Sequence, residues 1–138
     1  MQQATSNKQQ GNDGKVTSFT QLEAWKTGHK TVLDIYMITK KFPKDEIFGL
    51  TSQMRRCAVS ITSNIAEGFG RFSYKEKVQF YAISRGSITE LQNQLLIAKD
   101  IGYISKLEFD KIAGKTIETH KMVQGLIKSS QRRISGKS

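Results

Sequence analysis

Four stretches of the chain place apolar residues three and four positions apart, and a single proline, Pro43, interrupts its 138 residues. This spacing puts apolar side chains on one face of a helix, and a helix interior tolerates proline least of all residues. The pattern therefore favours long amphipathic helices and an all-α fold. Helices joined by short connections pack as antiparallel neighbours, so the sequence predicts an up-and-down four-helix bundle.

Stop signals bound the four periodic stretches. We expect helices over residues 20–41, 51–68, 74–101 and 106–128. Pro43 ends the first helix and suits the start of a short helical turn before the acidic pair that follows it. Gly68 and Gly70 are expected to close the second helix through left-handed backbone, and Gly102 is expected to close the third.

Start signals precede the last three helices. Thr51 or Ser52 is the expected cap of the second helix. The third and fourth helices each follow a Ser-x-x-Glu capping box, in which serine and glutamate satisfy each other's backbone amides. The two pairs are Ser73 with Glu76 and Ser105 with Glu108.

One buried stripe is predicted on each helix. On the first helix it is Leu22, Trp25, His29, Val32 and Tyr36, and on the second it is Met54, Cys57, Ala58, Ile61 and Ile65. On the third it is Tyr74, Tyr81, Ser84, Ile88, Leu91, Leu95 and Ala98, and on the fourth it is Phe109, Ala113, Thr116, His120, Val123 and Ile127. Gly114 and Gly125 weaken the fourth helix by about 1 kcal/mol each, which suggests a packing role or fraying there.

Further apolar residues lie beside these stripes. They are Ile35, Ile38 and Phe42 on the first helix, Val59 on the second, and Phe80 and Ile83 on the third. A monomeric bundle needs an apolar face of about three residues in seven, so a wider face indicates a second buried side. Self-association is the favoured interpretation, and a broader core is the alternative.

The two ends of the chain differ in composition from its middle. Residues 1–17 are polar and are expected to be disordered, residues 18–128 form the bundle, and residues 129–138 form a basic flexible tail. The amino terminus lacks the apolar core of a secretory signal, and no segment reaches the roughly 18 apolar residues of a membrane span. We therefore expect a cytoplasmic protein that makes no use of a membrane.

The chain is strongly basic, with a formal net charge of +10, of which +6 lies within residues 19–128. Such an excess favours a polyanionic partner, nucleic acid before membrane. RNA is the preferred ligand, and an acidic protein bound by an adaptor or scaffold is the alternative.

Residues 53–77 combine cations with aromatic side chains, a mixture that suits phosphate contacts and base stacking. The candidate nucleic-acid contacts are Arg55, Arg71, Lys75 and Lys77, and the interleaved aromatic residues are Phe69, Phe72 and Tyr74. The alternative is that the aromatic rings plug the end of the bundle. We expect reversal of Arg71, Lys75 and Lys77 to glutamate to abolish binding, with removal of residues 129–138 as an independent control.

No constellation of catalytic or metal-ligating residues stands out, so we expect no enzyme activity, no cofactor and no metal. Cys57 is the single cysteine and is interpreted as a small buried hydrophobe. His29 and His120 are interpreted as satisfied histidines on apolar stripes. Asn64 and Glu67 are interpreted as parts of a structural hydrogen-bond network.

Several motifs together resemble a bacterial family of four-helix-bundle proteins encoded in intervening sequences of 23S rRNA genes. The matching segments are Phe42-Pro43-Lys44-x-Glu46, Leu50-Thr51-Ser52-Gln53-x-x-Arg56, Ser60-Ile61-x-Ser63-Asn64-Ile65-Ala66-Glu67-Gly68, Arg71, Ala82-x-x-Arg85-Gly86-Ser87, Glu90-Leu91 and Leu95-Leu96-Ile97-Ala98-x-x-x-Gly102-Tyr103. Thr62 stands where the family pattern has proline, which predicts a straighter second helix.

The resemblance carries expectations of its own. It assigns structural roles to Arg56, Asn64, Glu67, Gly68, Arg85 and Glu90. Arg56 is expected to form a structural ion pair. The place of Arg85 in the middle of the third helix, beside small residues that allow a close helix approach, separately predicts a pair with a buried or interfacial carboxylate such as Glu67 or Glu90. The family is similar in fold to the accessory proteins of diversity-generating retroelements, which implies a ring-like homopentamer that binds nucleic acid and a reverse transcriptase.

Overall fold

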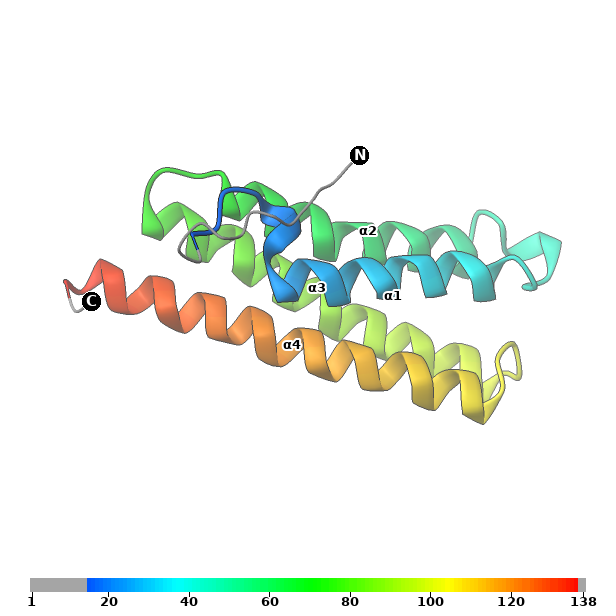
Figure 1. The fold of residues 1–138 in the computed structure, drawn as a ribbon. Helices are drawn as coiled ribbons and strands as arrows, with labels where there is room; N and C mark the ends of the chain where they lie inside the picture. The colour runs from blue at the N-terminus through cyan, green and yellow to red at the C-terminus, as the bar shows by residue number, and fades with distance from the viewer. Residues whose placement is uncertain (1–14, 137–138) are drawn as a thin grey trace.

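A computed structural model describes residues 15–136, and Figure 1 shows four long helices packed side by side. The helices are α1 (Glu23–Thr39), α2 (Leu50–Phe69), α3 (Tyr74–Asp100) and α4 (Lys106–Ile134). Two short 3-10 helices, η2 (Phe19–Gln21) and η3 (Lys44–Glu46), precede α1 and α2. Successive helices run in opposite directions, which confirms the predicted all-α up-and-down bundle.

The antiparallel order gives the bundle two different ends. The α2–α3 connection and the carboxyl end of α4 lie at one end, on the left of Figure 1, and we call this the corner end. The α1–α2 and α3–α4 connections lie at the opposite end. The longest helix is α4, which has 29 residues and spans about 44 Å, and α3 follows with 27 residues.

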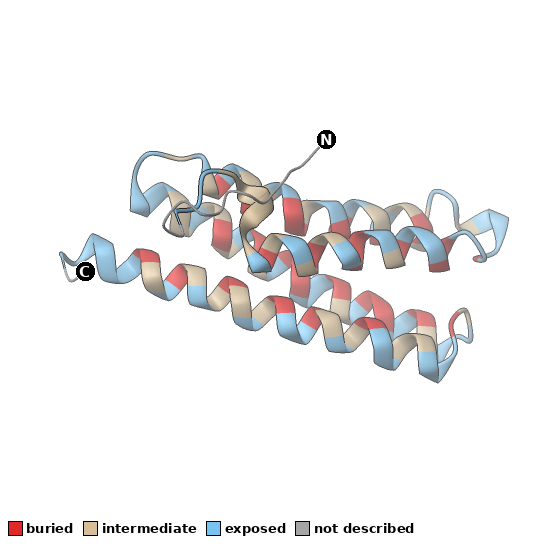
Figure 2. Cartoon of the chain, in the orientation of Figure 1, coloured by how far each residue is buried: buried red, intermediate tan, exposed pale blue. Residues whose placement is uncertain are grey.

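The core runs along the inner faces of all four helices, as Figure 2 shows. Every residue of the stripe predicted on α2 is buried, and so are the residues from Tyr81 to Ala98 of the stripe predicted on α3. The predicted stripe extends too far at Tyr74, whose ring is 36% exposed at the beginning of α3. On α4, Thr116, Val123 and Ile127 are buried, whereas Phe109, Ala113 and His120 lie at the edge of the core.

The stripe predicted on α1 is correct at Val32, which is buried, but the centre of the buried face lies about one row away. Ile35, Ile38 and Phe42, which the sequence suggested as a second apolar face, are buried in the core. Tyr36 is exposed, and the ring of Trp25 stacks on His29 at the edge of the core, with centroids 4.6 Å apart. The α1 residues therefore give no support to self-association.

Helix α2 begins at a different cap from the one predicted. Neither Thr51 nor Ser52 caps it; instead the Glu46 carboxylate accepts a hydrogen bond of 3.0 Å from the Leu50 amide. The second oxygen of Glu46 accepts a hydrogen bond of 2.8 Å from the Tyr103 hydroxyl. Glu46 therefore joins η3, α2 and the α3–α4 connection at the opposite end.

Glycine ends α3 as predicted, but it ends α2 differently. Gly102 has a φ of +88°, and the Tyr103 amide donates to the Ala98 carbonyl, as in a Schellman motif. Gly70 follows α2 with a φ of −81°, so no left-handed residue closes that helix. Gly68 lies inside α2, one residue before its end, and so does not close the helix.

The serine caps of α3 and α4 lie where the sequence predicts them. The Ser73 hydroxyl accepts a hydrogen bond from the Glu76 amide at 3.1 Å, and Ser105 accepts one from the Glu108 amide at 3.0 Å. Of these two serines, Ser105 alone has the full capping box, because the Glu108 carboxylate also accepts from the Ser105 amide at 2.9 Å.

Helix α4 is longer than predicted. It continues to Ile134, so most of the segment interpreted as a flexible tail, residues 129–138, is helical; residues 137–138 lie outside the described part of the chain. Gly114 and Gly125 neither break the helix nor pack closely, because a Cβ at either position would meet nothing within 4 Å. The amino-terminal segment 1–14, most of the region expected to be disordered, also lies outside the described residues.

Removing either serine cap should destabilise the fold. We expect Ser73→Ala and Ser105→Ala each to lower the free energy of unfolding by about 1 kcal/mol, because each leaves a helix-terminal amide without its acceptor. Urea melts at a fixed protomer concentration measure the effect. Ser63→Ala on the exposed face of α2 is the control, and an equal loss there would contradict the assignment.

The Glu46 carboxylate should make stability depend on pH. The hydrogen bond from the Leu50 amide, and then that from the Tyr103 hydroxyl, lower the pKa of Glu46 below its ordinary 4.5. The stabilisation is therefore complete above the pKa of the unfolded chain and is lost as the pH falls through the lower folded value. Glu46→Gln should be less stable than the wild type at pH 7, and the difference should shrink below pH 4.

Thermal melts from pH 7 to pH 3 measure this difference. The matched control is Glu118→Gln, because the Glu118 side chain makes no hydrogen bond within residues 15–136. A gap between Glu46→Gln and wild type that stays constant with pH would show that the carboxylate does not cap α2.

Candidate nucleic-acid interface

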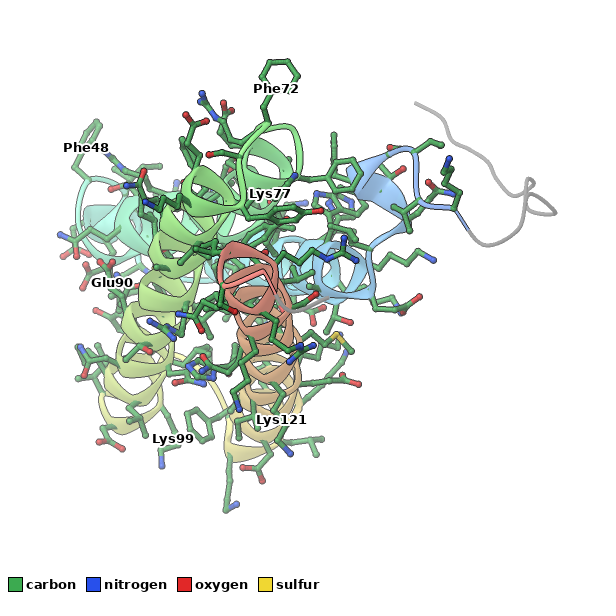
Figure 3. The ribbon with its side chains drawn as sticks, turned by 90° about the vertical axis from the view of Figure 1, so that its left-hand side faces the viewer. Phe48, Phe72, Lys77, Glu90, Lys99 and Lys121 are labelled. Carbon is green, nitrogen blue, oxygen red and sulfur yellow. The ribbon has the colours of Figure 1, made fainter. Side chains whose placement is uncertain are left out.

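Cations from three elements gather at the corner end, which Figure 3 views along the bundle. Arg71 and Lys75 come from the α2–α3 connection and the first turn of α3. Arg133 comes from the last turn of α4, and its guanidinium donates to the Tyr74 hydroxyl at 3.1 Å. This contact places the last turn of α4 directly beside the beginning of α3.

Arg71 is held in place rather than free. Its guanidinium pairs with the Glu67 carboxylate, one helical turn earlier, at 2.5 Å. It also lies over the ring of Phe80, 4.5 Å from the centroid. Both side chains of the ion pair are about half exposed, so water screens the pair and a phosphate can still reach the outer edge of the guanidinium.

Lys77 has a structural task that the sequence does not reveal. Its ammonium donates to the carbonyl oxygens of Phe69 at 2.6 Å and Gly68 at 3.3 Å, which are among the carbonyls left without partners at the end of α2. Burial lowers the pKa of Lys77. The structure therefore places this predicted phosphate contact in the role of a cap for α2.

Three other cations at this end are unengaged. Lys75, Lys128 and Arg132 are exposed and make no ion pair within residues 15–136. The carboxylates on the neighbouring turns are Glu67, which Arg71 already neutralises, and Glu76. The corner end is therefore positive, and we define the basic end as Arg71, Lys75, Lys128, Arg132 and Arg133.

The aromatic residues of the corner divide into engaged and free rings. The Lys77 ammonium lies 5.4 Å from the Phe69 centroid and 6.0 Å from that of Tyr74. Phe72 is fully exposed and projects away from the bundle, as Figure 3 shows. Phe72 therefore does not plug the end of the bundle, and its ring is open to stacking.

Arg55 does not join this group. Arg55 lies near the beginning of α2, about four helical turns before the α2–α3 corner. Its guanidinium donates to the Thr39 hydroxyl at 2.8 Å. The same group covers the ring of Tyr36 at 4.7 Å. Arg55 therefore ties α2 to the end of α1, at the opposite end of the bundle from Arg71.

The motif residues of α2 and α3 form a seam between these helices. The Asn64 amide donates to the Ser60 carbonyl at 2.8 Å, and the Ser60 and Ser87 hydroxyls share a hydrogen bond of 2.8 Å. This network agrees with the structural role expected for Asn64, while Glu67 lies outside it. The Ser84 hydroxyl adds a buried hydrogen bond of 2.8 Å to the Ile61 carbonyl.

Gly68 allows the two helices to come close beside this seam. A Cβ at Gly68 would lie 2.7 Å from the Tyr81 ring, which is buried. Thr62 contributes on the other side of α2, where its methyl group lies 3.1 Å from the position of a Cβ at Gly28 of α1. Helix α2 runs unbroken through Thr62.

Two motif residues are placed differently from the expectation. Arg85 pairs with neither Glu67 nor Glu90, because its guanidinium donates to the Gln124 side chain of α4 at 2.8 Å. Arg56 is exposed and makes no ion pair in the described part of the chain. It lines an open groove between α2 and α3, together with Glu90.

Cys57 lies beneath this groove as a buried group. Its thiol donates to the Ser87 carbonyl at 3.0 Å. Burial, and then the nearby Glu90 carboxylate, raise the pKa of Cys57 to about 12. The thiol is therefore protonated at neutral pH, as expected of a structural cysteine.

No group of three or more histidine, cysteine or acidic side chains within residues 15–136 is arranged to hold a metal ion. No helix in the same range is long and apolar enough to cross a membrane.

The contribution of α4 also has a signal in the sequence, a run of basic residues that lies outside the motifs. After Glu118 the chain has five lysines and arginines and no acidic residue. Because four of these cations, Lys121, Lys128, Arg132 and Arg133, belong to α4, which ends at the α2–α3 corner, removal of residues 129–138 is not a control independent of the corner.

Fold and surface together define a small antiparallel four-helix-bundle protein with one cationic end. A family model described as 23S rRNA-intervening sequence protein matches residues 20–125. The chain belongs to this family, as its motifs predicted.

A crystal structure from Bacteroides thetaiotaomicron, of a protein with unknown function from the S23 ribosomal protein family, has the same fold. The TM-score is 0.71 at 20% identity, over 76% of this chain and 95% of that one. No curated protein sequence matches the chain.

Gly68→Ala should destabilise the seam, because the added methyl group meets the buried Tyr81 ring and forces one helix to shift. We expect a loss of about 1–3 kcal/mol in the free energy of unfolding. Gly70→Ala is the control, because its Cβ would find only ordinary contacts beyond 3.4 Å. Urea melts that rank the two variants equally would contradict the close approach of α2 and α3.

Proposed function

We propose that this protein is a non-catalytic, homo-oligomeric nucleic-acid-binding protein that takes structured RNA through its basic end. The observation that carries the proposal is the convergence of cations from the α2–α3 corner and from α4 on one end of the bundle. Contacts of this kind neutralise phosphates and release counterions, so they bind without reading sequence.

RNA with unpaired bases fits this surface better than a continuous duplex. Phe72 presents a fully exposed ring beside Arg71 and Lys75. Bases in loops and at ends are free to stack on such a ring while their phosphates meet the neighbouring cations. A hairpin with a single-stranded loop is therefore the appropriate probe.

The oligomeric part of the proposal rests on exposed apolar residues. Ile83 and Val59, predicted as surplus apolar residues, are exposed in the folded chain. Family resemblance favours a pentameric ring, in which copies of the basic end would act together.

A scaffold for an acidic protein is the second candidate, and a groove between α1 and α4 supports it. Met37, Ile38 and Ile112 line this groove of about 460 Å³ together with Lys40 and Lys111. Its remaining lining residues, Asp34, Lys41 and Glu108, are engaged in ion pairs. Neither Lys40 nor Lys111 makes an ion pair within the described residues. An amphipathic acidic segment would complement it.

Charge reversal at the basic end should weaken RNA binding. For Lys75→Glu combined with Arg132→Glu, we expect at least a tenfold loss of affinity for the hairpin in 50 mM salt, because two phosphate contacts become repulsive. The slope of log affinity against log salt, measured up to 200 mM, should decrease by about two. Fluorescence anisotropy gives both quantities, and neither residue caps a helix or packs in the core.

The matched control is Lys40→Glu combined with Lys111→Glu, which makes the same change in net charge at the opposite end. It should leave RNA affinity within about threefold of the wild type. Equal losses for both double variants would show that only the overall charge attracts RNA. A wild type that binds no RNA in 50 mM salt would favour the scaffold interpretation.

A further inference from the structure

The outer face of α3 carries apolar residues that nothing within residues 15–136 covers. Its members recur three and four residues apart, and we call them the outer row: Ile83, Gly86, Glu90, Asn93, Ile97 and Ile101. Ile83 and Ile101 are about half exposed, and Ile97 is 41% exposed. The opposite face of the same helix lies in the core, so α3 is apolar on two sides.

Gly86 lies in the middle of this row. Glycine in a helix interior costs about 1 kcal/mol relative to alanine. A Cβ at Gly86 would meet nothing within 4 Å, whereas Gly28 and Gly68 each make room for a neighbouring helix. Packing within the chain therefore gives no reason for a glycine at this position.

An open glycine alone does not identify an interface. Gly114 and Gly125 of α4 are equally open, and the exposed residues beside them are mostly charged, among them Glu118, Lys121 and Lys128, with Ile117 the exposed apolar neighbour of Gly114. Gly86 differs because it adjoins a groove: Ser87, the next residue, and Glu90, one turn later, both line it.

That groove lies between α2 and α3 and has a volume of about 450 Å³. Phe48, which is 92% exposed, lies at its edge, and Figure 3 shows Phe48 and Glu90 projecting on the same side of the bundle. Arg56 and Glu90 both line the groove, yet neither makes an ion pair within residues 15–136.

The charge of this surface identifies its occupant. The chain carries +10, so two copies repel each other over most of their surface. The groove and the outer row hold one cation, Arg56, and one anion, Glu90, and are neutral together. A second copy offers the same two charges, so that Arg56 of one copy can meet Glu90 of the next.

We propose that the α2–α3 groove and the outer row of α3 form the surface through which copies of this chain associate. Gly86 allows a helix of the second copy to pack at the short end of the usual 8–10 Å between helix axes. Phe48, Ile83 and Ile97 supply apolar area around the Arg56–Glu90 contacts. The proposal rests on the oligomeric part of the proposed function and adds the face that carries it.

A pair of glycine substitutions tests this face. Gly86→Leu should block the close approach, whereas Gly125→Leu, at an equally open position on α4, should leave association unchanged. Leucine favours the helix more than glycine does. At dilutions where each protein is monomeric, neither variant should therefore melt at a lower temperature than the wild type. Light scattering over a dilution series should show wild type and Gly125→Leu well above 15.6 kDa, with the dissociation constant of Gly86→Leu raised at least tenfold.

Charge exchange provides a second test that does not depend on size. Arg56→Glu and Glu90→Arg should each weaken association at least tenfold, and the double exchange should restore it. An oligomer that is insensitive to Gly86→Leu and to both single reversals would overturn this face while leaving self-association intact. A wild type that stays at the mass of one chain would overturn self-association itself, and RNA binding would still be decided separately by the anisotropy titration.

Discussion

The close contact between α2 and α3 is the interaction on which the rest of the molecule depends. Gly68 brings the two backbones together at Tyr81, and the Ser84 hydroxyl crosses the interface to the Ile61 carbonyl. Small residues and short polar side chains thus add specific contacts to the large apolar residues that α2 and α3 bury in the core. Because these hydrogen bonds have fixed partners, they also fix the register of α3 against α2. The corner at one end and the groove along the side both follow from that register.

The sequence predicts the helices well because each one has its own periodicity and its own end signals. It misplaces the buried face of α1 because two apolar rows lie side by side on that helix, and spacing alone cannot rank them. Packing ranks them by size: Gly28 faces α2 and α4 at close range, and the small residues on its side of α1 are buried together with Ile35, while Tyr36 stays at the surface. The cap of α2 was also missed, because Glu46 acts across a bend that only the folded chain defines.

The candidate site could be predicted in composition but not in arrangement. Arg71 and Lys75 lie where the corner places them, whereas Lys77 is directed inward by carbonyl oxygens at the end of α2. Arg55 is separated from them by most of the length of α2 and is held by α1. Arg133 joins them because α4 continues to Ile134, beyond Ile127, the last residue of its predicted stripe. The sequence therefore shows which residues are cationic. Whether a cation is free to bind a ligand depends on the groups that the folded chain places beside it, such as the carbonyl oxygens around Lys77.

The proposed binding end and the proposed association face are linked by their geometry. The face runs along the helices, so association through it leaves both ends of each bundle uncovered. If neighbouring copies lie parallel, as in a ring, their basic ends point the same way and one RNA can contact several of them, which multiplies the phosphates neutralised per particle. If they lie antiparallel about a two-fold axis, adjacent basic ends point in opposite directions and each acts alone. The salt dependence of RNA binding therefore distinguishes the two arrangements. Gly86→Leu separates the copies and leaves the basic end itself unchanged. If the slope of log affinity against log salt becomes less steep in this variant, the copies lie parallel.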